Sequence, residues 1–261
     1  RRGVEPGRRR GGALMAVARR ARRLEVGLSS ALREFLREPV NVALLVALPP
    51  LVIVSYGSIM SSFPELPGMS SSPETLGAVA GTLFVAAFLP GVIGLFQVIS
   101  ARRADERLSL VGFPRGTLFV ARLATVAAAS LLTGAIALAV LTTRTDVASL
   151  PAAFGTLALV GVLYGLVGML IGAVLPRELE GSLVLVFVAD IDEALASGIV
   201  ETDAAFVQLL PLHYPHELFE AAVDGSAMAT GDVLATGAYV GVLALVAVGV
   251  YTTLTGEGGL R

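Results

Sequence analysis

Three acidic residues interrupt an apolar stretch of the chain: Asp190, Asp192 and Glu193. Carboxylates inside a membrane helix are costly, and there they commonly bind protons or cations. At the outer membrane interface the same residues would be only the polar end of a helix. Both interpretations are open from the residue types alone, and the distribution of arginine described below favours the interface.

The only two histidines, His213 and His216, lie in the sequence LLPLHYPHELFE. With Glu217 they resemble a metal cluster, but a structural zinc ion needs four ligands. Because Pro215 separates the histidines, we predict that they do not share one regular helix face. We expect Pro215 to begin a short helix, with Glu217 and Glu220 around its first turns. The pattern therefore favours a structural role, with no metal site.

Lysine and cysteine are both absent, and all 19 basic residues are arginine. A Walker A loop needs a lysine for the nucleotide phosphates, so the chain cannot be an ATPase of that kind. The absence of lysine also excludes Schiff-base chemistry, and the absence of cysteine excludes thiol chemistry. Ser197 lies on no supported nucleophile loop, so a serine–histidine hydrolase is disfavoured. We expect no catalytic residue and no cofactor in this chain.

Long apolar segments flank the acidic residues and histidines described above and must position them. The chain is 55% hydrophobic and 15% charged, with a mean hydropathy of +0.79, whereas soluble domains are about 25% charged. About 20 apolar residues span a bilayer as a helix. Five windows meet this length: 41–60, 77–99, 117–141, 152–175 and 233–254. A sixth, 182–200, is interrupted by the three acids, and we predict an all-α polytopic membrane protein with six transmembrane helices.

The arginines predict the orientation of these spans. With six spans and a cytoplasmic N-terminus, 17 of the 19 arginines lie on cytoplasmic segments, while Arg144 lies outside and Arg122 within a span. Residues 190–232 hold nine acids and no arginine. Positive charge is retained in the cytoplasm, so we predict cytoplasmic N- and C-termini. The membrane we expect is the plasma membrane of a prokaryotic cell.

The N-terminal region divides into two parts: residues 1–23 precede a single transmembrane domain, 24–261, and residues 24–38 are the first part of that domain. Eleven arginines precede residue 40. We expect residues 1–23 to be a disordered basic tail near anionic lipid rather than a nucleic-acid-binding segment. In residues 24–38, apolar and charged side chains alternate at helical spacing, which predicts an interfacial elbow helix. Pro39 would end it.

The fourth span carries four glycines on one stripe: Gly161, Gly165, Gly168 and Gly172. Their spacing forms two linked GxxxG units, which allow another helix to approach closely. Packing within the chain is favoured over a dimer face.

The loop between the second and third spans, 101–122, is the only cytoplasmic loop long enough to form its own helix. Its charged turn and the break that follows contain Arg102, Arg103, Asp105, Glu106, Arg107, Pro114 and Arg115. From the residues alone, a docking surface for a soluble partner and a solvated linker are equally supported.

This loop also carries a resemblance to a known family. Its residues follow a degenerate pattern in the order Glu106, Arg107, Leu110, Pro114, Arg115, Leu118 and Arg122. The chain thereby resembles an ABC-2 type transporter permease, the membrane subunit of an ABC exporter. The resemblance covers nearly the whole chain and implies an elbow helix, six spans with a short fifth, and a re-entrant outer segment before the last. The three acids in span five depart from that pattern.

The resemblance implies a half-transporter that pairs with a second copy or a sister permease. A separate ATP-binding subunit, which would hold ATP and Mg, would dock on the elbow residues Arg33 and Arg37 and on the loop from Arg102 to Arg115. Export is the expected direction. The alternative is an ion-coupled secondary transporter or channel that uses Asp190, Asp192 and Glu193.

Overall fold

The computed structural model describes residues 39–64, 71–110, 115–198 and 205–254. The expected basic tail (1–23), the elbow helix (24–38) with Arg33 and Arg37, and Pro114 lie outside the described residues.

The described residues form helices and no strands. In chain order these are α2 (Pro39–Met60), α3 (Pro73–Leu110), α4 (Arg115–Leu141), α5 (Leu150–Val174), α6 (Glu178–Ala196), the short 3-10 helix η1 (Ala205–Leu209), α7 (His213–Asp224) and α8 (Thr230–Leu254). The all-helical class predicted from the sequence is confirmed for this part of the chain.

Within the described ranges, five helices are long and apolar enough to cross a membrane: Ala43–Met60, Pro73–Arg102, Leu118–Leu141, Leu150–Val174 and Thr230–Val250. They coincide with five of the six predicted windows. The sixth window falls on α6, whose two acids in the first turn and three near its end make it too charged to qualify. The chain is therefore a helical protein with the features of a multi-pass membrane protein.

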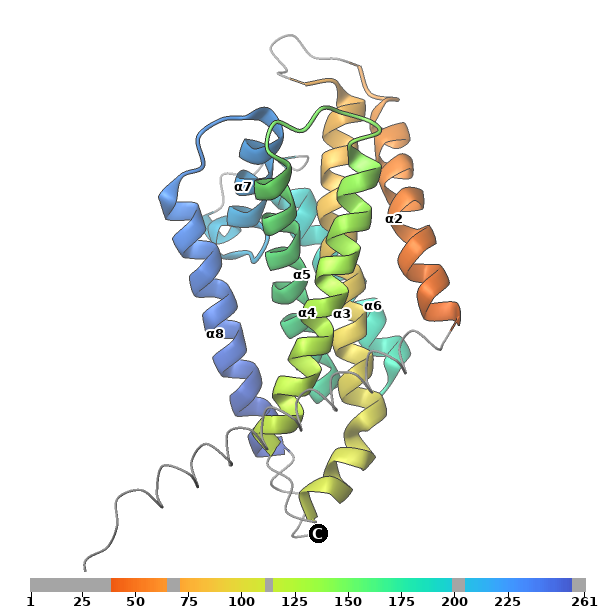
Figure 1. The fold of residues 1–261 in the computed structure, drawn as a ribbon, viewed down its shortest axis with the longest axis vertical. Coiled ribbons are helices and arrows are strands. Elements are labelled where there is room, and N and C mark those ends of the chain that lie inside the picture. Colours follow the sequence, from red (N-terminus) through yellow and green to blue (C-terminus); the bar gives the residue numbers. More distant parts are fainter. Residues whose placement is uncertain (1–38, 65–70, 111–114, 199–204, 255–261) are drawn as a thin grey trace, which may run out of the picture.

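The five apolar helices run side by side along the long axis of the molecule (Figure 1). α3 is the central helix, since it packs against α2, α4, α5 and α6 and most of its apolar residues are buried. α2 and α8 lie at the edges of the bundle and leave most of their apolar surface uncovered by protein. Such apolar outer surfaces suit a lipid surrounding.

α6 runs back along α3 toward the residues that precede α7. Its first turns pack on α3, where Gly181 lies against Leu95. Its last turn lies beside Leu212, which precedes α7. Backbone bonds from Ala148 to Val223 (3.0 Å) and from Ser149 to Ala222 (2.9 Å) attach α7 to the loop between α4 and α5. α7 therefore lies at the end of the bundle opposite the charged end of α3 (Figure 1).

The glycine stripe of α5 packs against α3 and α4 inside the chain. A Cβ atom at Gly161 would lie 2.6 Å from Ser130, and one at Gly172 would lie 2.7 Å from the carbonyl oxygen of Leu95. At Gly168 it would collide with the carbonyl oxygen of Gly91, and at Gly165 with Val126. Gly168 and Gly172 thus allow a close approach to the backbone of α3, and Gly161 and Gly165 leave room for side chains of α4.

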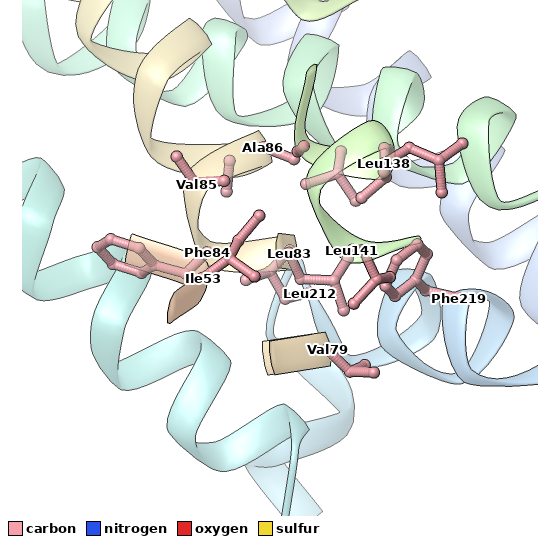
Figure 2. Packing of buried hydrophobic residues seen from close by; sticks show 14 of the residues in the cluster. Ile53, Val79, Leu83, Phe84, Val85, Ala86, Leu138, Leu141, Leu212 and Phe219 are labelled. Atoms are coloured by element: carbon pink, nitrogen blue, oxygen red, sulfur yellow. The ribbon is translucent and has the colours of Figure 1, made fainter. Parts of the chain in front are cut away.

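The apolar core extends from the spanning helices to α7. Figure 2 shows Ile53 of α2, Leu83 of α3 and Leu141 of α4 in one cluster with Leu212 and Phe219. Phe219 and Leu212 are fully buried. The packing holds α7 firmly against the bundle and positions the polar side chains described next.

Candidate functional site

A buried polar cluster lies where the end of α6 meets α5 and α7. On α6, Leu185, Ala189, Asp192 and Glu193 fall at i, i+4, i+7 and i+8, which places them on one helix face. All four are buried, and Asp192 and Glu193 are only 1% and 2% exposed. Asp190 lies on the exposed side of α6, where it accepts a hydrogen bond from the Tyr56 hydroxyl at 2.7 Å.

Asp192 connects three segments of the chain. Its carboxylate accepts a short hydrogen bond from the hydroxyl of Tyr164 on α5. The backbone N–H of Leu212, just before α7, lies 3.1 Å from Oδ2 and 3.3 Å from Oδ1. These two donors satisfy a carboxylate that burial removes from water.

His216 of α7 bridges two glutamates. Its Nδ1 lies 3.2 Å from Oε1 of Glu193, and its Nε2 lies 3.2 Å from Oε1 of Glu220, one helical turn along α7. His216 is 3% exposed and Glu220 is 40% exposed, so the row of three runs from the interior to the surface. The contact with Glu193 is a close ion pair without hydrogen-bond alignment, and neither oxygen of Glu193 meets a donor among the described residues.

The two glutamates determine the charge of His216. Burial alone would lower the pKa of His216, but the carboxylates of Glu193 and Glu220 raise it to about 10. The hydrogen bond from His216 in turn lowers the pKa of Glu220, against the opposing effect of burial. His216 is therefore cationic at neutral pH. Its stabilising contribution is complete below its ordinary pKa of 6.5 and is lost as pH rises through about 10.

One expectation from the sequence is wrong here. We expected Pro215 to begin the helix, but α7 begins at His213, two residues earlier, so both histidines belong to one helix. Proline is tolerated in the first turn because its missing N–H has no acceptor within the helix. Among the described residues, no group of three or more histidine or acidic side chains is arranged to hold a metal ion.

A second finding concerns the acids of α6. Their position at the outer membrane interface stays a prediction, while the structure encloses Asp192 and Glu193 in protein and leaves only Asp190 exposed. Their partners come from α5, α7 and the residue before α7, which no local pattern links to α6. The helical spacing from Leu185 to Glu193 was the one signal that could have placed these acids on a buried face.

Those of the expected docking residues that the structure describes lie at the other end of the bundle. Arg102 is half-buried and donates hydrogen bonds to the carbonyl oxygens of Gly172 (3.0 Å) and Ala173 (3.1 Å) at the end of α5. It thus stabilises the C-terminus of α5. Arg107 is exposed. Arg103, Asp105 and Glu106 lie in the same helix, and Arg115 is the first residue of α4.

Arg122 lies inside the apolar part of α4. It is half-buried, and its guanidinium donates a hydrogen bond of 2.8 Å to the carbonyl oxygen of Gln97 on α3. This bond links α3 and α4 close to the charged end of the bundle.

The chain matches no model of a known protein family and no curated protein. The assignment of function therefore depends on composition, on the arrangement of the helices and on the two polar ends of the bundle.

Proposed function

We propose that the chain is the membrane-spanning permease subunit of an ATP-binding cassette exporter, driven by a separate ATP-binding subunit. One observation carries the proposal: α3 continues as an unbroken helix from its apolar segment, which ends at Arg102, to Leu110. This charged extension belongs to the central helix of the bundle. A subunit that pushes on it would move the helix that packs against α2, α4, α5 and α6.

The composition supports a partner that supplies the energy. A chain without lysine cannot form the nucleotide-binding loop of a P-loop ATPase. In this proposal ATP and Mg are bound by the partner. A second copy of the chain, or a sister permease, completes the transport pathway.

The proposed topology has six passes, with α6 as the short fifth. The 19 residues of α6 extend about 28 Å as a helix, close to the thickness of a bilayer core. In this proposed topology Arg107 lies on the cytoplasmic side of the plasma membrane, and the pass of α6 puts α7 on the outer side. Both termini are then cytoplasmic, which agrees with the distribution of arginine.

A second function is favoured by the buried acids Asp192 and Glu193. Carboxylates enclosed in a helical bundle are common in ion-coupled transporters. In that case the chain alone, reconstituted in liposomes, would carry flux driven by an ion gradient, and Asp192→Asn would abolish it.

Site-specific cross-linking tests the docking surface. Because the chain has no cysteine, Arg107→Cys introduces a single thiol at an exposed position. We expect a thiol-directed cross-linker in native membranes to join Arg107→Cys to a protein that contains a Walker A sequence. Asp146→Cys, exposed at the opposite end of the bundle, is the matched control and should give no such adduct.

Two results would contradict this assignment. One is labelling of Arg107→Cys by a membrane-impermeant thiol reagent added outside intact cells. The other is an identical set of adducts from Arg107→Cys and Asp146→Cys.

A further inference from the structure

An imbalance of charge is buried where α6 meets α7. Three carboxylates line the site, Asp192 and Glu193 from α6 and Glu220 from α7, and the exposed Asp190 of α6 also acts on Glu193. α5 contributes the neutral hydroxyl of Tyr164. His216 is the one cationic side chain in contact with them among the described residues. The ion pairs recorded for arginine lie elsewhere, between Arg144 and Glu74 and between Arg177 and Glu180. Full ionisation would leave a net negative charge in a site largely closed to water, which is costly.

The positions of the hydrogen-bond donors indicate which carboxylate takes up a proton and so reduces the buried negative charge. Asp192 receives the Tyr164 hydroxyl and the Leu212 N–H, and these donors favour its ionised form. Glu193 is 2% exposed, and neither of its oxygens receives an aligned hydrogen bond in the described chain. Burial without aligned donors favours proton uptake by this carboxylate, and this effect outweighs the opposing attraction of the nearby His216 cation.

We propose that Glu193 is a binding site for one exchangeable proton, loaded through His216 and Glu220 from the face of the protein that carries α7. Glu220 is 40% exposed and forms the outer end of the row, while His216 contacts both glutamates at 3.2 Å. In net terms, Glu193 gains one proton from water and His216 keeps its charge. The process makes and breaks only O–H and N–H bonds.

Loading this site should control the attachment of α7. With Glu193 protonated, the charges of His216 and Glu220 balance each other, and Asp192 retains its two donors. With Glu193 ionised, the buried negative charge favours entry of water between α6 and α7. The proton therefore acts as a ligand that holds α7 on the bundle, because it binds the closed arrangement more tightly. The site does not depend on the proposed ATPase partner.

Infrared difference spectroscopy on the full chain in lipid nanodiscs tests this site directly. We expect wild-type protein to lose the C=O band of about one protonated carboxyl per chain as pH rises. Hydrogen–deuterium exchange of α7 should increase over the same pH range. Glu193→Gln, which mimics the protonated form, should lack the band and should keep α7 protected throughout. Glu217→Gln, an exposed change on the same helix, is the control and should behave as wild type.

A second variant tests the proposal without altering Glu193. Glu220→Gln removes a negative charge from the row, so the wild-type band should be lost at a pH lower by about one unit. The proposal is wrong if Glu193→Gln retains the band, or if Glu220→Gln leaves its midpoint unchanged. A midpoint that differs between sodium and potassium buffers would overturn it in favour of a cation site.

Discussion

A methyl group at Gly168 is expected to lower the free energy of unfolding by about 2 to 3 kcal/mol, because it overpacks the interface between α3 and α5. The Cβ atom of Gly168→Ala would collide with the carbonyl oxygen of Gly91, and its next neighbours are the carbonyl carbon and Cα of the same residue. Backbone cannot rotate aside as a side chain can. The two most extensively packed helices must therefore move apart. Unfolding of the purified protein in mixed micelles by denaturant measures the loss.

Gly155→Ala is the matched control on the same helix. No atom lies within 4 Å of a Cβ built at Gly155. Alanine is also preferred over glycine within a helix, by about 0.5 to 1 kcal/mol. The control should therefore be neutral or slightly stabilising. Equal losses from the two substitutions would show that the close approach of α3 and α5 is not the cause.

Removal of His216 is expected to have an effect of similar size. His216→Ala should lower the free energy of unfolding at neutral pH by about 3 kcal/mol, because it deletes the cation between two carboxylates and leaves a cavity beside Glu193. The same unfolding assay applies. The loss should shrink as pH rises toward about 10, where wild-type His216 itself becomes neutral.

The chain offers its other histidine as the control. His213 is half-buried, and its ring packs edge-on against Tyr214 at 4.9 Å, so His213→Ala should cost less than about 1 kcal/mol. Combining His216→Ala with Glu193→Gln should recover at least about 1 kcal/mol relative to the sum of the single losses. Additive losses would mean that His216 and Glu193 do not interact, despite their 3.2 Å separation.

The apolar helices could be predicted because each depends on a local property of the sequence. Residues 77–99 and 152–175 are continuous apolar runs, and length with hydropathy is enough to identify such segments. The glycine stripe of α5 could be predicted for a similar reason, since the glycines from Gly161 to Gly172 recur at helical spacing. The six-span count is not established, because the acids of α6 exclude that helix from the candidate spans.

The polar cluster could not be predicted, since it is assembled from distant segments. Tyr164 and Asp192 are 28 positions apart, and Leu212 lies a further 20 beyond Asp192. No periodicity connects them. The sequence also treated Pro215 as a break between the histidines, whereas a first-turn position allows proline to remain within α7. At the other end, no local pattern predicted that Arg102 binds the carbonyl oxygens that end α5.

ATP hydrolysis by the protein purified from native membranes tests the central proposal most directly. If the chain is a permease driven by a separate subunit, the wild-type preparation should contain a nucleotide-binding protein and hydrolyse ATP. Arg103→Glu combined with Arg107→Glu should lose both that protein and the hydrolysis, with no change in the unfolding of the chain. A wild-type preparation that lacks ATP hydrolysis, yet carries ion-driven flux as a single chain in liposomes, would contradict the proposal.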